Sequence, residues 1–201
     1  MRQRSDARRT TGEGVLMDSN EAVSRLEIRD ALQRYCRGLD RRDRPVAVSA
    51  FHEDSHIVHG HFAGTGPDWV DWLFADPPTD RVGIGDADPA LDVVESQQHH
   101  LTNQWIDLDG DVAYSEAYFL EYTLTRRGGD RYLTSVGGRY AERYERRDVG
   151  WRIAERFAVR DWDSVRLVEA RFPGWERSPQ GARDRSDPSY RPGLHREGGR
   201  P

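Results

Sequence analysis

The sequence predicts an α+β fold in which helices pack on one face of a curved antiparallel sheet. Helical patterns dominate residues 18–76, and long strands joined by tight turns follow from residue 95. Helices followed by an antiparallel meander are typical of this class, because one face of the sheet must be buried against another layer. The chain has 201 residues, which is enough for one domain with a hydrophobic core. We therefore expect a single domain at residues 18–168.

The first helix is expected over residues 18–40. Asp18, followed three residues later by Glu21, indicates a capping box at its start. Apolar side chains recur every three or four residues, as they do on one face of a helix: Ile28, Leu32, Tyr35 and Leu39.

Two shorter helices and a strand are expected next. In residues 42–54, Asp43 can cap a helix that has Pro45 in its first turn, where the missing N–H costs little. Residues 55–64, SHIVHGHFAG, alternate like a strand and end in glycine. Residues 64–76 predict a third helix with a hydrophobic patch.

Four long strands follow a loop. Residues 77–90 are rich in Pro, Gly and Asp, which predicts the loop. The strand segments are HHLTNQWIDL, VAYSEAYFLEYTLT, RYLTSVGGRYAERYE and WRIAERFAVRDW. They are separated by DGD, RRGGD and RRDVG, and glycine beside aspartate in two of these turns favours hairpins.

The two ends differ in composition from the central domain. We expect residues 1–17 to be disordered and Met17 to be the true start, a reading favoured over a transit peptide. Residues 169–201 are dense in Pro, Gly, Ser and Arg, so they are expected to be extended or disordered. The alternative is that WERSPQGARDRSDPSY folds over a pocket or a neighbouring subunit.

Composition and missing motifs exclude several functions. The formal net charge of −5 argues against a nucleic-acid partner. Cys36 is the only cysteine, so no intrachain disulfide can form, and no apolar run is long enough for a membrane helix. We expect a cytoplasmic protein. The phosphate-binding GxxxxGK[ST], the dinucleotide-binding GxGxxG and the nucleophile motif GxSxG are all missing.

Asp40 and His99 are the best candidates for catalysis. A carboxylate that accepts a hydrogen bond from an imidazole fixes its tautomer and leaves the other nitrogen free to move a proton. The alternative for Asp40 is a salt bridge with the arginines that follow it. Because neighbouring strand residues face opposite sides, one of His99 and His100 must face inward, and the residues alone leave open which one does.

Other candidates carry weaker signals. His59 and His61 share a strand face and could bind a metal together with His99, but this spacing lacks a carboxylate, and no metal is expected. Tyr118 belongs to a stripe of tyrosines that is more typical of sheet packing than of a ligand cage. Arg156 shares a strand face with small residues, so it can point into a cavity or into solvent.

Four blocks of the sequence together carry a family resemblance: YCRGLDRRD, FHEDSHIVHGHFAG, HHLTNQWIDLDGDVAYSEAYFL and GGRYAERYERRDVGWRIAERFAVRDW. They resemble SnoaL-like proteins of the nuclear transport factor 2-like (cystatin-like) superfamily, and the resemblance covers residues 21–163. It implies a cone in which helices wrap a curved sheet around a largely apolar pocket. Relatives include hexachlorocyclohexane dehydrochlorinase, scytalone dehydratase, bile-acid 7α-dehydratase and polyketide cyclases, several of which work without a cofactor.

The resemblance also implies roles for individual residues. Asp40 and His99 match the dyad of the dehydrochlorinase, and Arg156 matches a pocket arginine. Tyr35 precedes Asp40 by five residues, as the catalytic tyrosine does in the bile-acid dehydratase. On the next strand this chain departs from the dehydratase, because Tyr122 stands where the dehydratase has an acidic residue.

These observations predict a cofactor-independent lyase or isomerase of the dehydratase or cyclase type, acting on a small apolar cyclic molecule. Neutral His99 would remove a proton and Asp40 would orient it. Substrate-binding side chains are expected from Tyr35, His59, His100, Tyr118 and Arg156. The alternative is a non-catalytic ligand-binding module, or an assembly module like the small subunit of a ring-hydroxylating oxygenase. Self-association as a dimer or trimer is expected in either case.

Overall fold

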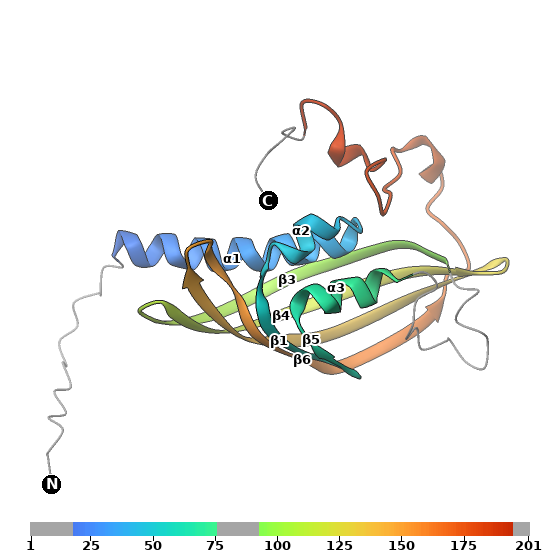
Figure 1. The fold of residues 1–201 in the computed structure, drawn as a ribbon. Helices are drawn as coiled ribbons and strands as arrows, with labels where there is room; N and C mark the ends of the chain where they lie inside the picture. Colours follow the sequence, from blue (N-terminus) through green and yellow to red (C-terminus); the bar gives the residue numbers. More distant parts are fainter. Residues whose placement is uncertain (1–17, 76–92, 195–201) are drawn as a thin grey trace, which may run out of the picture.

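The computed structural model describes residues 18–75 and 93–194 (Figure 1). Its α-helices are α1 (Ser19–Asp40), α2 (Arg44–Val48) and α3 (Gly66–Phe74). Its strands are β1 (Phe51–His59), β2 (Phe62–Gly64), β3 (Val93–Asp109), β4 (Val112–Arg127), β5 (Asp130–Arg147) and β6 (Gly150–Leu167). The predictions for residues 1–17 and for the loop at 77–90 lie outside the described residues.

The strands form one curved sheet in the order β2-β1-β6-β5-β4-β3. The four long strands β3 to β6 pair as antiparallel hairpins, as the turn sequences predicted. β1 pairs in parallel with β6, so the sheet is mixed rather than wholly antiparallel. No hairpin turn connects these two strands, so local turn patterns could not predict their relative direction.

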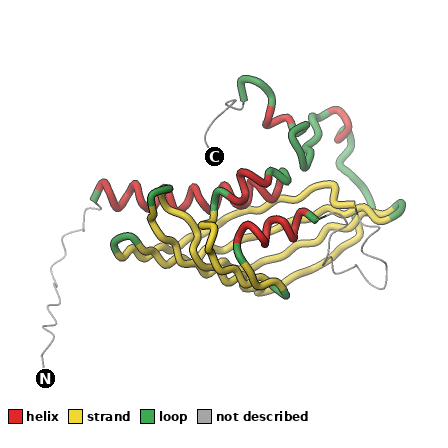
Figure 2. The backbone as a smooth tube through the Cα atoms, in the orientation of Figure 1, coloured by secondary structure: helices red, strands yellow, loops and turns green. Residues whose placement is uncertain are grey.

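Helices cover one face of this sheet, giving the α+β arrangement that was predicted (Figure 2). The face of α1 predicted from periodicity is buried, with Ile28, Leu32, Tyr35 and Leu39 between 0% and 4% exposed. Alternate residues of β4 and β5 meet it from the sheet: Ala113, Ala117, Phe119, Tyr140 and Tyr144. No helix among the described residues is both long and apolar enough to cross a membrane.

The helix ends differ from the expected caps. Asp18 and Asp43 occupy the N-cap positions of α1 and α2, but neither side chain caps its helix. The Asp43 carboxylate instead accepts a hydrogen bond from the hydroxyl of Tyr190 at 2.7 Å. In α3 the hydroxyl of Thr65 accepts from the backbone N–H of Asp68 at 3.2 Å, a regular cap.

The segment after β6 is folded up to residue 194, whereas an extended or disordered chain was expected. It contains two short 3₁₀ turns, η2 (Trp175–Arg177) and η3 (Pro188–Tyr190). The carboxylate of Asp187 accepts from the backbone N–H groups of Ala182 and Ser189, both at 2.9 Å, which ties the segment to itself. Composition predicts disorder because the segment is rich in ionic and polar side chains, but some of these, such as Asp187, bind specific partners.

Candidate active site

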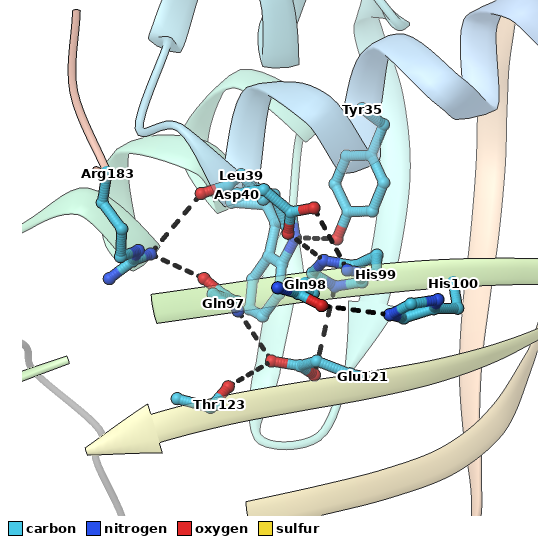
Figure 3. Close-up of polar contacts among 11 residues, drawn as sticks. Tyr35, Leu39, Asp40, Gln97, Gln98, His99, His100, Glu121, Thr123 and Arg183 are labelled. Atoms are coloured by element: carbon cyan, nitrogen blue, oxygen red, sulfur yellow. Dashed lines mark hydrogen bonds and ion pairs between the residues drawn. The ribbon is translucent and has the colours of Figure 1, made fainter. Parts of the chain in front are cut away.

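Asp40 and His99 meet where the last turn of α1 crosses β3 (Figure 3). Oδ1 of Asp40 lies 2.7 Å from Nδ1 of His99, and Oδ2 accepts the backbone N–H of His99 at 3.1 Å. One carboxylate therefore holds both the ring and the backbone of the histidine. The His99 side chain is 3% exposed and that of Asp40 is 15% exposed. The contact directs Nε2 of His99 away from Asp40 and toward β4.

The alternation of β3 settles which histidine faces inward. His99 is buried, whereas His100 is on the opposite face, where its ring lies near Gln98 and against Tyr122. Tyr118 is on that same outer face, 39% exposed, with the guanidinium of Arg139 over its ring. The structure thus does not bring His100 and Tyr118, both predicted to bind substrate, to the site.

Glu121 is a member of the site that the sequence analysis missed. It lies directly opposite His99 in the β3–β4 register, with its Oε2 4.0 Å from Nε2 of the histidine. Gln97 Nε2 and Thr123 Oγ1 donate to its Oε1 at 2.6 and 3.1 Å. The resemblance to the dehydratase puts Tyr122 at the position of the acidic residue, which is one residue too far along β4. Residues two apart on a strand share a face, so Glu121 lies on the same face of β4 as the buried Phe119. This alternation could have identified Glu121 from the sequence.

The two carboxylates set the charge of the histidine. Burial lowers the pKa of His99, but the Asp40 hydrogen bond and the negative charges of Glu121 and Asp40 outweigh it, so the pKa lies above its ordinary value. Burial raises the pKa of Glu121, but the charge of His99 and the Gln97 and Thr123 hydrogen bonds outweigh it, so that pKa is lowered. The carboxylates therefore stabilise the protonated ring of His99, and Glu121 is in turn stabilised as an anion.

Tyr35 and His59 lie in the interior with His99. The rings of His59 and Trp69 stack with centroids 4.4 Å apart, and Trp69 Nε1 donates to the Tyr35 hydroxyl at 3.1 Å. Burial lowers the pKa of His59 to about 4, which makes its ring neutral near pH 7. Burial also raises the pKa of Tyr35 to about 12, so its hydroxyl keeps a proton to donate.

Arg156 is buried, but it does not face open space. Its side chain is 0% exposed and forms an ion pair with Glu142, whose carboxylate also accepts from the hydroxyl of Tyr144 at 2.6 Å. The guanidinium lies over the rings of Tyr35 and Tyr140, 4.0 and 4.4 Å from their centroids. Arg156 is therefore not placed to contact a substrate directly, as was expected. It lies beneath the ring of Tyr35, in a part of the interior that tyrosines fill.

A hollow of about 410 Å³ borders the Asp40–His99 pair. It is lined by Gln33, Cys36, Arg37, Asp40, Arg41, His99 and Leu101. This lining is largely polar, in contrast to the apolar pocket that was expected. The alternative of a metal site gains no support, since the described parts of the chain contain no group of three His, Cys, Asp or Glu side chains that could hold an ion. His61 is exposed in the turn after β1.

A curved mixed sheet with helices on one face is the arrangement of the nuclear transport factor 2-like fold. Residues 20–157 match the family model described as a SnoaL-like domain, and the chain belongs to that family.

Solved structures share this fold at low sequence identity. LinA is 20% identical with a TM-score of 0.61, and the match covers 78% of this chain and 98% of that one. Hexachlorocyclohexane dehydrochlorinase LinA-type3 from Novosphingobium barchaimii LL02 is 19% identical with a TM-score of 0.59, covering 76% and 96%. A nuclear transport factor 2-like protein from Salmonella enterica is 16% identical with a TM-score of 0.52, covering 78% and 98%. No curated protein sequence gives a significant match.

Proposed function

We propose that this protein is a lyase or isomerase that needs no cofactor, and that His99 is its general base. The observation that carries the proposal is the 2.7 Å contact between Asp40 Oδ1 and His99 Nδ1, which leaves Nε2 as the reactive nitrogen. A buried histidine with a carboxylate on each side is poised for proton transfer, because both carboxylates stabilise the imidazolium that forms.

The proton transfer follows from this geometry. With its Nδ1–H donated to Asp40, neutral His99 takes a proton from a ring carbon of the substrate onto Nε2. The electron pair of the broken C–H bond forms a double bond as the leaving group departs, or shifts an existing double bond. Tyr35, whose hydroxyl stays protonated, donates a proton or a hydrogen bond to the departing group. Glu121 stabilises the new imidazolium across 4.0 Å.

The substrate class is a compact cyclic molecule with an acidic ring proton. The ring of Trp69 stacks on His59, and Trp69, Trp72 and Phe62 are in mutual contact. Such rings favour an apolar ring compound. Hexachlorocyclohexane dehydrochlorinase, a structural neighbour, is named for elimination from a substrate of this kind.

A non-catalytic ligand-binding or assembly role is the second candidate. It is favoured by the tyrosines that fill the interior around Arg156, and by an exposed apolar hollow of about 310 Å³ on the outer face of the sheet. The two candidates differ in what the loss of His99 does. A binding module would keep its function without a general base.

The test uses a panel of small cyclic alcohols and cyclic halides, with elimination and solvent-deuterium uptake as readouts. His99→Ala is expected to lower turnover by about 10²- to 10⁴-fold, the usual contribution of a positioned base. His100→Ala is the matched control, because it removes the neighbouring imidazole from the outer face and is expected to leave turnover unchanged. Equal turnover by wild type and His99→Ala would refute the mechanism.

A further inference from the structure

The C-terminal segment lies across the end of α1, beside the candidate site (Figure 1). Three polar contacts hold it there. The Tyr190 hydroxyl donates to Asp43 at 2.7 Å, Arg185 pairs with the same carboxylate at 3.5 Å, and Asp187 pairs with Arg41 at 3.4 Å. The Arg37 guanidinium also lies 5.0 Å from the centroid of the Tyr190 ring. The segment is therefore anchored at several points.

From this anchored segment Arg183 reaches into the site (Figure 3). Its guanidinium donates to Oε1 of Gln97 at 2.6 Å and to the carbonyl oxygen of Leu39, next to Asp40, at 3.5 Å. The amide nitrogen of the same Gln97 donates to Glu121 at 2.6 Å. A chain of hydrogen bonds thus runs from Arg183 through Gln97 to the carboxylate that faces His99.

The Gln97 amide has a single satisfied orientation between these two partners. A guanidinium can only donate and a carboxylate can only accept, so the amide oxygen must face Arg183 and the amide nitrogen must face Glu121. The cation also polarises the amide, which strengthens the hydrogen bond that the amide donates to the carboxylate. In the flipped orientation the amide nitrogen would face the guanidinium and the amide oxygen would face the carboxylate, so neither hydrogen bond could form.

We propose that Arg183 is a positioning residue of the candidate active site, which acts through Gln97 to hold the Glu121 carboxylate opposite His99. The C-terminal segment is then a part of the site and more than a covering of α1. This inference rests on the proposed function for its catalytic meaning, but the positioning itself is measurable without a substrate.

Glu121 is the group whose titration reports on this positioning. The titratable side chains that act on it come from the elements packed around it: Tyr35 and Cys36 on α1, His59 on β1, His99 on β3 and Tyr140 on β5. Arg156 on β6 acts on both of the histidines. Arg183→Ala leaves all of these in place. It removes the cation that orients the amide, together with the longer hydrogen bond to the Leu39 carbonyl oxygen, so the carboxylate loses part of its stabilisation as an anion.

The experiment is a carbon-13 NMR titration of the glutamate carboxyl groups in the full chain, with Glu121→Gln to assign the signal. Arg183→Ala is expected to raise the pKa of Glu121 by about one unit, the scale of a charge-assisted hydrogen bond. Arg183→Lys, which keeps a donor-only cation, is expected to restore part of the shift. Arg185→Ala, which removes a cation of the same segment that contacts Asp43 and Tyr190, is expected to leave the pKa of Glu121 unchanged.

Gln97→Met provides a second route, because it breaks the relay without altering the segment. It is expected to raise the pKa of Glu121 at least as much as Arg183→Ala does. An unchanged pKa of Glu121 in Arg183→Ala, or in Gln97→Met, would overturn the inference. If the pKa shifts but His99→Ala retains full turnover, the positioning stands and the proposed function falls, so the two failures can be told apart.

Discussion

Arg156 and Glu142 form an ion pair in which both side chains are 0% exposed. The charges are costly to bury, and the faces of the Tyr35 and Tyr140 rings attract the guanidinium but carry no formal charge to neutralise it. The pair is stable because each partner neutralises the other. Removal of one partner leaves the other charge buried and uncompensated.

Arg156→Met is therefore expected to destabilise the fold by about 3–5 kcal/mol in urea unfolding. Adding Glu142→Gln to that variant removes the orphaned charge, so the double variant is expected to recover much of the loss. A double variant no more stable than Arg156→Met would show that packing, and not charge, accounts for the cost.

At the scale of residues, the sequence predicted part of the site. It identified Asp40 and His99, which the structure places in contact, because an acid at a helix end and a strand histidine matched a family pattern. It missed Glu121, since a shift of one residue in a strand exchanges the two faces of the sheet. It also missed Arg183, because an irregular segment has no periodicity from which a spatial neighbour can be inferred.

Among the elements, α1 and α2 approach each other closely at Gly38. A Cβ built on Gly38 would lie 2.3 Å from the backbone nitrogen of Ala47, a contact with main chain that cannot move aside easily. Glycine at this position allows the last turn of α1, which carries Asp40, to pack against α2.

Gly38→Ala is expected to cost about 1–3 kcal/mol of stability through overpacking, although alanine is the better helix former. Gly129→Ala is the matched control, because nothing lies within 4 Å of its added methyl, and its effect is expected to stay within about 0.5 kcal/mol. Thermal or urea unfolding of the two variants checks this. A stabilised Gly38→Ala protein would contradict the packing argument.

The elements themselves were largely predictable where their patterns are local. Helical periodicity located α1, and glycine-containing turns located the four-strand meander. The boundary between α2 and β1 was less visible: α2 ends at Val48 and β1 begins at Phe51, several residues before the predicted strand. Short elements bury few residues, so their periodicity is weak.

For the whole molecule, the outer face of the sheet carries an exposed apolar patch formed by Trp105, Tyr114 and Phe157. Both charge signs flank it, with Arg143 paired to Glu155 beside the hollow. A patch with apolar side chains and both signs of charge can complement its own copy around a two-fold axis. We propose that this face mediates self-association.

Light scattering of the purified protein is accordingly expected to give the mass of a dimer, the assembly that a two-fold contact closes. Trp105→Arg is expected to shift the mass toward the monomer, whereas Val149→Arg, at an exposed turn away from the patch, is expected to leave it unchanged. A wild-type protein that stays monomeric at high concentration would contradict the proposal.

The central claim is that Asp40 fixes the tautomer of His99 and raises its pKa, and nitrogen-15 NMR of the histidine rings tests this most directly. With His99→Ala to assign the signal, Nδ1 is expected to stay protonated while Nε2 loses its proton at a pKa above the ordinary value of about 6.5. Because that pKa is raised on folding, the stabilisation is complete below about pH 6.5 and is lost as the pH rises through the folded pKa. Asp40→Asn is expected to lower the pKa. A wild-type His99 that titrates at or below the ordinary value, or that Asp40→Asn leaves unchanged, would contradict the account.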